Sequence, residues 1–284
     1  MRANRLVHAL EPINNAKWKG HYSRIREHPA GIPCNILLPY HNIWHKIKND
    51  PVRQAEVIRD FREEVAPDGL VLIDNGVYTL KNQLGLSAAK GEAAGSEIIG
   101  EGHFTKDTLL PYLEQYTDFL VAANDWWDYA FDFDCEQLIG AKAVDEFHEI
   151  IVSRGNIERH RLIRSYHNVR PNVNQWWDKL CVDDRYIYVA IEGGNSHNRD
   201  PNFYRPLTDI AHQHGKLVHI FAATTLKMMQ EIPADTFDSA SYLIGGRFGE
   251  VITPVGNISF ADRKTTRNDY YHLETAVQEQ LREH

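Results

Sequence analysis

Segments with a helical spacing of apolar residues alternate along the chain with short segments that are apolar throughout. In residues 52–65, Val57, Ile58 and Phe61 recur at the spacing of an amphipathic helix. The next segment, Leu70–Ile73, is continuously apolar and ends abruptly in polar residues, as a buried strand does. This alternation predicts repeated strand–helix units and therefore a parallel sheet.

The predicted elements fill most of the chain. Strands are expected at 70–73, 129–133, 161–166, 186–191, 216–221, 236–237 and 251–253, and helices at 52–65, 105–119, 135–152, 204–214, 225–230 and from about 269. Six or seven strand–helix units favour a single (β/α)8 barrel with rim-loop insertions, and an open doubly wound sheet is the alternative. We expect one catalytic domain over residues 1–284, with a first strand and rim elements in residues 1–50 and a long rim loop over 81–103.

Acidic residues follow four of the predicted strands at the point where each strand ends: Asp74, Asp134, Glu192 and Asp238. The carboxyl ends of parallel strands gather at one rim of a barrel, and active sites are built there. For any one of them the alternative is a simple helix cap, most of all for Asp74, which turn residues follow. Taken together, they predict a carboxylate-rich site.

Two further residues are candidates for substrate contacts. Asp132 lies two positions before Asp134, so on one strand the two would share a face and both could point to the barrel centre. The alternative is that one of them is solvated beyond the end of the strand. His167 ends another predicted strand and is a third candidate at the same rim.

The least ordinary segment runs from residue 237 to residue 249. Here FDSASY at 237–242 is followed by the glycine-rich sequence GGRFG at 245–249. Glycines let backbone N–H groups approach a phosphate, and the guanidinium of Arg247 could hold it by two hydrogen bonds. The alternative is a plain turn with a surface arginine. The first interpretation predicts that Asp238 faces an anion-binding loop.

These motifs resemble those of the tRNA-guanine transglycosylases. VLIDNGVY at 71–78 resembles the hydrophobic–Asp–Ser–Gly–aromatic segment of that family, and FDCE at 133–136 resembles its second acidic strand end. Residues 237–247 resemble its nucleophile strand and arginine loop. Residues 216–227, taken with 237–249, are more similar still to shorter phage-associated relatives that are implicated in placing 7-deazaguanines into DNA. The resemblance is patchy and extends from about residue 69 to residue 254.

The resemblance implies a pentosyltransferase that exchanges guanine for a 7-deazaguanine base. Asp238 would attack the anomeric carbon and form a covalent glycosyl-enzyme, and Asp74 would serve as general acid and base. Asp134, with Asp132, would hydrogen-bond the Watson–Crick edge of the base.

Other contacts follow from the same resemblance. Gly193 and Gly194, directly after Glu192, would offer backbone donors beside the base, and Arg247 would hold a flanking phosphate. The base would have to be flipped out of a duplex or presented in a single strand. The tryptophan pairs at 126–127 and 176–177 are candidates for base stacking, although paired tryptophans more often anchor helices in a core.

The chain departs from the family in ways that bear on its substrate. The closely spaced zinc-binding cysteines of the tRNA enzymes are missing, Ser239 stands where cysteine follows the nucleophile, and Asn75 stands where serine is usual. These departures favour DNA over tRNA. The alternatives are the same exchange on tRNA, a nucleoside or glycoside hydrolase that uses Asp74 and Asp238, and a barrel that only binds nucleic acid.

Composition and charge limit these expectations. A formal net charge of −8 is unusual for a protein with a broad basic face for nucleic acid, although basic residues cluster at 263–267. The three cysteines form no CxxC pair, and His212 and His214 are typical of a helix end, so we expect no metal and no other cofactor.

The expected location follows from two missing sequence features. The chain has no continuous apolar run of about 18 residues and no secretory signal, which predicts a cytoplasmic protein of a bacterium or a phage-infected cell that does not use a membrane. A homodimer or an accessory protein is a candidate partner.

Overall fold

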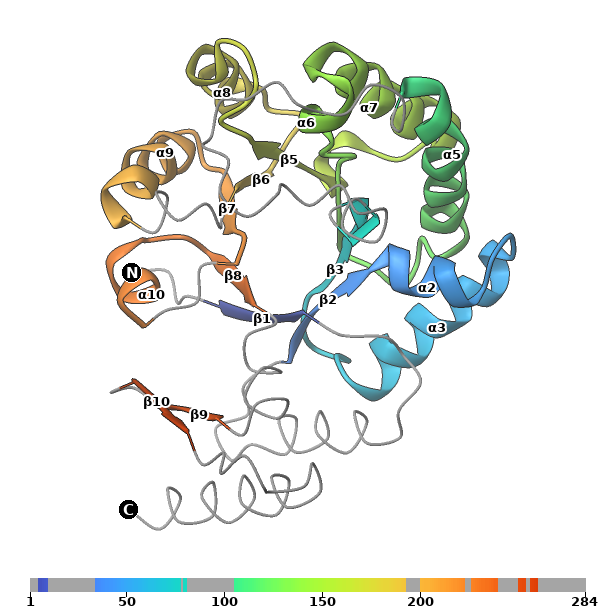
Figure 1. Cartoon of the computed structure of the whole chain (residues 1–284), viewed down its shortest axis with the longest axis horizontal. Helices are drawn as coiled ribbons and strands as arrows, with labels where there is room; N and C mark the ends of the chain where they lie inside the picture. The colour runs from blue at the N-terminus through green and yellow to red at the C-terminus, as the bar shows by residue number, and fades with distance from the viewer. Residues whose placement is uncertain are drawn as a thin grey trace.

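Eight parallel strands form a closed barrel in the order β1 to β8, and β8 pairs with β1 to close it (Figure 1). The computed structural model describes residues 5–9, 34–77, 79–80, 105–192, 200–222, 226–239, 250–253 and 256–259. The described helices surround the ring of strands (Figure 1). The predicted (β/α)8 barrel is therefore confirmed, and closure by the β1–β8 pair rules out the open sheet.

The elements have the following bounds. The barrel strands are β1 (Arg5–Ala9), β2 (Asn35–Pro39), β3 (Val71–Asp74), β4 (Tyr129–Phe131), β5 (Leu162–Tyr166), β6 (Tyr188–Ile191), β7 (Leu217–Ile220) and β8 (Thr236–Ser239). The helices are α2 (Tyr40–Lys46), α3 (Pro51–Glu64), α5 (Lys106–Ala122), α6 (Glu136–Ile139), α7 (Ala141–Gly155), α8 (Val173–Val182), α9 (Pro201–Gln213) and α10 (Leu226–Glu231), with a short 3₁₀ turn at Arg159–Arg161.

Two predicted elements differ from the structure. The strand expected at 251–253 belongs to β9 (Glu250–Thr253), which pairs antiparallel with β10 (Gly256–Ser259) in a separate sheet outside the barrel. The helix expected over 135–152 is divided into α6 and α7 because Gly140 has a φ of 80°, which a continuing helix cannot accommodate. The single domain over 1–284 stays a prediction, and the loop at 81–103 and the helix from 269 lie outside the described residues.

The pleat of the strands sorts their side chains into an inner and an outer set. The barrel interior is filled by one cluster: Leu37, Leu72, Phe131, Ile163, Tyr188 and Ala190. The alternate positions, such as Val71 and Ile73 on β3, pack against the helices in a larger core. Side chains along a strand alternate between the two faces with a period of two residues. The residue two positions after an interior residue therefore also points inward, and it lies at the carboxyl-end rim.

Gly76 lies in the turn that follows β3 and has a φ of 75°. A Cβ at this position would lie 2.4 Å from the Cβ of His41 and 2.7 Å from its backbone nitrogen. Gly215 has a similar φ of 72°, but a Cβ there would meet nothing within 4 Å. We expect Gly76→Ala to lower the free energy of unfolding by about 1–3 kcal/mol more than Gly215→Ala does, measured by urea unfolding. Equal losses would show that the contact with His41 relaxes at no cost.

Among the residues that the structure describes, no helix combines the length and the apolar character that a membrane crossing requires.

Candidate active site

Three of the predicted carboxylates occupy inward positions at the carboxyl-end rim. Asp74 follows the interior Leu72 on β3 by two residues, and Glu192 follows the interior Ala190 on β6 in the same way. Asp238 follows Thr236 on β8, whose hydroxyl group meets the interior Tyr188. Segments far apart in the sequence therefore bring their carboxylates to one end of the barrel.

Asp74 is the most perturbed of these acids. Burial raises its pKa to about 7, and the negative charges of Asp134 and Asp238 add to this, while the backbone N–H groups of Gly76 and Asn75 partly oppose it. The electrostatic effect of Asp134 and Asp238 on Asp74 requires that the three carboxylates lie near one another. Asp74 can therefore both hold and release a proton near neutral pH.

Asp134 is fixed from two sides. The side-chain amide of Asn75 donates hydrogen bonds to its carboxylate and, at 2.6 Å, to the backbone oxygen of Asp132. The amide oxygen of Asn75 accepts from the N–H of Val77 at 2.8 Å, which fixes the orientation of the amide. On its other side, the carboxylate of Asp134 lies 3.5 Å from Nε2 of His167. The end of β3 and the end of β4 are thereby tied together.

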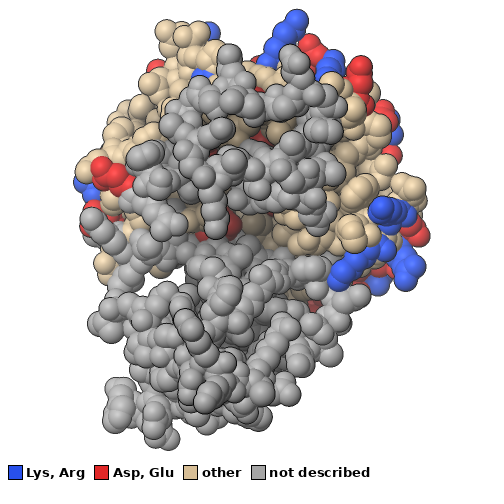
Figure 2. All heavy atoms as spheres, viewed as in Figure 1, with Lys and Arg blue, Asp and Glu red and all other residues tan. Residues whose placement is uncertain are grey.

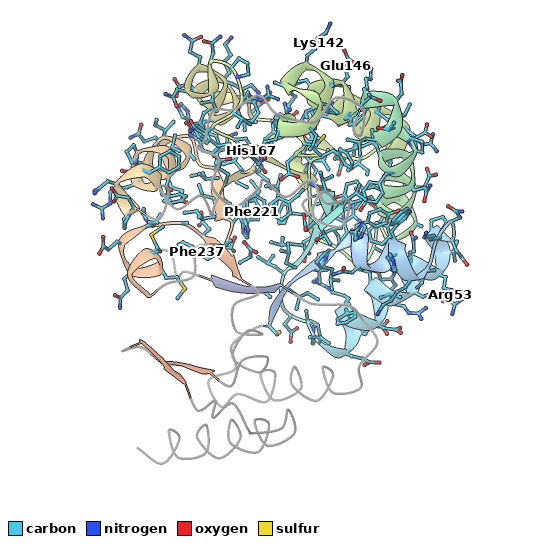
Figure 3. All side chains as sticks on the ribbon, viewed as in Figure 1. Arg53, Lys142, Glu146, His167, Phe221 and Phe237 are labelled. Atoms are coloured by element: carbon cyan, nitrogen blue, oxygen red, sulfur yellow. The ribbon has the colours of Figure 1, made fainter. Side chains whose placement is uncertain are left out.

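His167 bridges the carboxylates at the ends of β4 and β6. Its Nδ1 lies 3.2 Å from a carboxylate oxygen of Glu192, whose other oxygen accepts from the N–H of Asn168 at 3.0 Å. Burial alone would lower the pKa of His167, but its contacts with the carboxylates of Asp134 and Glu192 outweigh burial and raise it to about 10. His167 is therefore an imidazolium at neutral pH. Figure 3 shows it beside the ring of strands, away from Lys142 and Glu146 on the outer helix α7.

Asp238 is held on the opposite side of the rim. Its Oδ1 accepts a hydrogen bond from the N–H of Ala222 at 2.8 Å and lies 3.3 Å from Nε2 of His219. His219 is wholly buried and Asp238 is 8% exposed. His219 is not among the predicted site residues; its inward position on β7, next to β8, is the feature that could have identified it.

Asp132 does not share the site, so the expectation that it points to the barrel centre with Asp134 is corrected. Tyr129 and Phe131 are the inward residues of β4, and Asp132 therefore turns outward to the helices. There it pairs with Nδ1 of His148 at 3.1 Å and with Nε of Arg164 at 2.9 Å. Burial opposes its charge, but His148 and Arg164 hold the pKa of Asp132 well below its usual range. Its role is to stabilise the barrel wall.

The remaining candidates have separate outcomes. Gly193, Gly194 and Arg247 lie outside the described residues. Trp127 and Trp177 are buried anchors whose indole N–H groups donate to backbone oxygens at 3.0 and 3.2 Å, which is the helix-anchoring alternative to base stacking. Within the described ranges, no group of three or more His, Cys, Asp or Glu residues is arranged to hold a metal ion.

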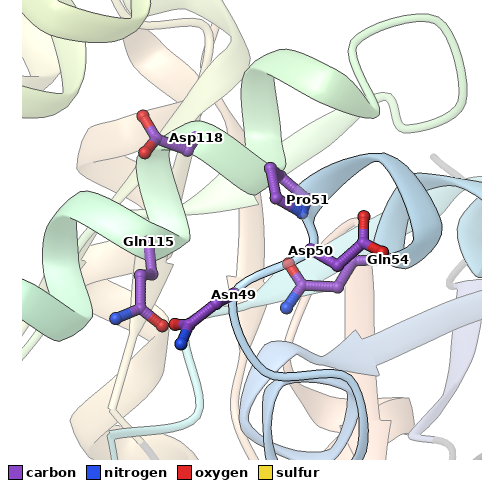
Figure 4. A pocket seen from close by; sticks show the side chains of 6 residues that line it. All are labelled: Asn49, Asp50, Pro51, Gln54, Gln115 and Asp118. Carbon is purple, nitrogen blue, oxygen red and sulfur yellow. The ribbon is translucent and has the colours of Figure 1, made fainter.

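A pocket of about 190 Å³ lies outside the barrel wall (Figure 4). It is formed between the start of α3 and helix α5, and its lining consists of Asn49, Asp50, Pro51, Gln54, Gln115 and Asp118. Asp50 caps α3 by accepting from the N–H of Arg53 at 3.0 Å. Asp50 therefore has a structural role as a helix cap, and we assign no chemistry to the pocket.

The charge of the described rim is acidic, because the carboxylates of Asp74, Asp134, Glu192 and Asp238 face a single imidazolium, that of His167. A surface of this kind repels a phosphate backbone. In the view of Figure 2, the visible lysine and arginine side chains lie toward the outline of the molecule. The nucleic-acid partner and the homodimer both stay predictions.

No family model matches the chain, and no curated protein sequence matches it. It is similar to solved structures of three enzymes at low identity. An enolase protein from the Sargasso Sea environmental genome is 9% identical, with 83% of this chain and 55% of that chain covered and a TM-score of 0.42. The carboxyl transferase domain of Rhizobium etli pyruvate carboxylase is 14% identical, with 84% and 40% covered and a TM-score of 0.41.

A dipeptide epimerase from Methylococcus capsulatus, complexed with Mg, is 11% identical, with 91% of this chain and 65% of that chain covered and a TM-score of 0.40. The chain thus spans only about two fifths to two thirds of the length of these three structures. Likeness at this level of identity concerns the barrel fold alone.

The comparisons correct the predicted family. No family model and no curated sequence matches the chain, and the three similar structures are an enolase, an epimerase and a carboxyl transferase domain; the predicted membership of the tRNA-guanine transglycosylases is therefore withdrawn. The function that rested on it, base exchange in DNA or tRNA through a covalent glycosyl-enzyme, is withdrawn with it, and so is the alternative of a nucleoside or glycoside hydrolase. Whether Asp238 takes part in catalysis stays a prediction. The three similar structures belong to enzymes, and none of the three is a pentosyltransferase.

Proposed function

We propose that this chain is an enzyme that performs general acid–base catalysis on a small molecule bound at the carboxyl-end rim of its barrel, with Asp74 as the proton carrier. The observation that carries this proposal is the pKa of Asp74, raised to about 7. General acids and bases work best when their pKa lies near the working pH. A strongly perturbed acid at this end of a β/α barrel is the feature expected of a catalytic group.

The surroundings of Asp74 indicate the class of molecule. Ionised carboxylates are hydrogen-bond acceptors only, so Asp134, Glu192 and Asp238 favour a ligand with positive charge or several donor groups. Asp134 and Glu192 are braced by His167, which keeps their geometry fixed without cancelling all of their charge. A small amine fits this rim better than an anion of the same size.

Binding and proton transfer are coupled in this arrangement. The charges of Asp134 and Asp238 are among the causes that keep the proton on Asp74. A bound cation beside them offsets that charge, lowers the pKa of Asp74 and favours release of its proton. Asp74 can thus donate a proton to one atom of the substrate and take one back in a later step, while the carboxylate of Asp238 stabilises positive charge.

A carboxyl-carbon NMR titration of Asp74 tests the proposal. We expect a midpoint near 7 in the free protein, a lower midpoint in Asp134→Asn, and a lower midpoint in the presence of 1,4-diaminobutane. Succinate, which has the same chain length and the opposite charge, should not lower it. Glu158→Gln, at an exposed ion pair with His160, is the matched charge-removing control and should leave the midpoint unchanged. A midpoint near 4 in the free protein would contradict a neutral-pH proton carrier.

A further inference from the structure

A chain of hydrogen bonds runs through the barrel interior beneath Asp238. The hydroxyl groups of Tyr188 and Thr236 are hydrogen-bonded to each other, and Oγ1 of Thr236 lies 2.8 Å from Nδ1 of His219. Nε2 of His219 lies 3.3 Å from Oδ1 of Asp238. Four side chains from β6, β7 and β8 thus connect the centre of the barrel to its rim, and we call them the interior relay.

The imidazole of the relay is in apolar surroundings. His219 is 0% exposed, and its ring centroid lies 5.1 Å from that of Phe131 and 4.9 Å from that of Phe221. Phe221 lies near the barrel centre in Figure 3. Burial between aromatic rings disfavours a charged imidazolium. A neutral imidazole has one donor and one acceptor nitrogen, and the hydrogen-bond partners decide which is which.

The direction of the relay follows from counting donors. Oδ1 of Asp238 accepts from the N–H of Ala222, and a carboxylate oxygen, which only accepts, can also bond Nε2 of His219 when that nitrogen carries the proton. Nδ1 must then accept from the hydroxyl group of Thr236, whose oxygen accepts in turn from the hydroxyl group of Tyr188. If Nδ1 of a neutral His219 donated to Thr236 instead, Nε2 would carry no proton, and Asp238 would have to donate one to it.

We propose that His219 is a positioning residue, fixed by Thr236 as its Nε2–H tautomer, that aims the carboxylate of Asp238 into the rim. This inference deepens the proposed function and rests on it for the use made of the charge on Asp238. Within the described residues, both donors engage Oδ1 of Asp238. Oδ2 is then the oxygen that meets the donor group of a ligand.

Nitrogen-15 NMR of the histidine side chains tests the relay directly. We expect His219 to have a protonated Nε2 and an unprotonated Nδ1 at pH 7. In Thr236→Val, which keeps the shape and removes the hydroxyl group, the Nδ1 resonance should move toward the value of a nitrogen without a hydrogen bond. Affinity for 1,4-diaminobutane should fall about fivefold, the effect of one hydrogen bond.

Thr208→Val is the matched control. Thr208 is equally buried, and its hydroxyl group donates to the backbone oxygen of Tyr204 at 2.9 Å within α9, so its loss should leave both readouts unchanged. An Nδ1–H tautomer or a doubly protonated His219 would overturn the inference, as would equal effects of the two valine variants. The test of this inference is separate from the test of the proposed function. An Asp74 midpoint near 4 would contradict the proposed function, while His219 could still have the expected tautomer.

Discussion

Asp132→Ala is expected to lower the free energy of unfolding by about 3–5 kcal/mol at pH 7, because it leaves the buried side chains of His148 and Arg164 without their shared carboxylate. Asp132 is 2% exposed and pairs with both His148 and Arg164. Urea unfolding measures the loss. Glu114→Ala removes an exposed carboxylate partner of Arg154 and should cost less than about 1 kcal/mol. Losses of similar size in the two variants would contradict a buried ion pair at Asp132.

The loss in Asp132→Ala should also depend on pH. The folded-state pKa of Asp132 lies below its unfolded value of about 4, so the unfolded chain takes up the proton first as the pH falls. The stabilisation by Asp132 is therefore fully present above about pH 4–5 and declines in more acidic solution. The difference in stability between the wild type and Asp132→Ala should narrow in acid.

Asp74→Asn is expected to change the free energy of unfolding in the opposite direction, raising it by about 2–4 kcal/mol at pH 8. The folded-state pKa of Asp74 is about 7, above the unfolded value of about 4, so the wild type loses stability as the pH rises between these values. Asparagine resembles the protonated acid and avoids this loss. The gain, measured by urea unfolding, should disappear near pH 4, and turnover should fall by about 10²–10⁴-fold.

Asp50→Asn is the control for this variant. It makes the same chemical change at the exposed N-cap of α3, where asparagine is as good a cap as aspartate, so it should give no gain that depends on pH. A pH-independent effect of Asp74→Asn would contradict the raised pKa. Asp132 and Asp74, at the ends of neighbouring strands, are thus expected to affect stability in opposite directions, and the cost at the rim is the one expected of the proposed proton carrier.

Much of the rim could be predicted from the sequence. Asp74 and Glu192 each follow a continuous apolar segment and Asp238 follows a shorter predicted strand, and parallel strands bring such positions to one end of a barrel. The period of two along each strand then separates inward from outward positions. The prediction that Asp132 points inward is wrong because β4 ends at Phe131. The inward residues of β4 are Tyr129 and Phe131, so Asp132 turns to the other face.

Other features depend on contacts that no local pattern reveals. The interior relay needs Tyr188, His219 and Thr236 from three strands, and its hydrogen bonds depend on the register of these strands in the closed barrel. The prediction of the family failed for a related reason, because it rested on short local motifs. Acidic strand ends and a glycine–arginine turn are general solutions for parallel barrels, so their presence carries little information about ancestry.

Closure of the ring through β1 and β8 has a consequence for synthesis. About 230 residues separate the two strands along the chain, and β1 pairs with Thr236–Ser239 on one side. At about 5–20 residues per second, the ribosome needs roughly 10 to 50 seconds to deliver β8 after β1 has emerged. Throughout that interval the nascent chain keeps one edge of β1 without its final partner, the state in which strands associate with other chains.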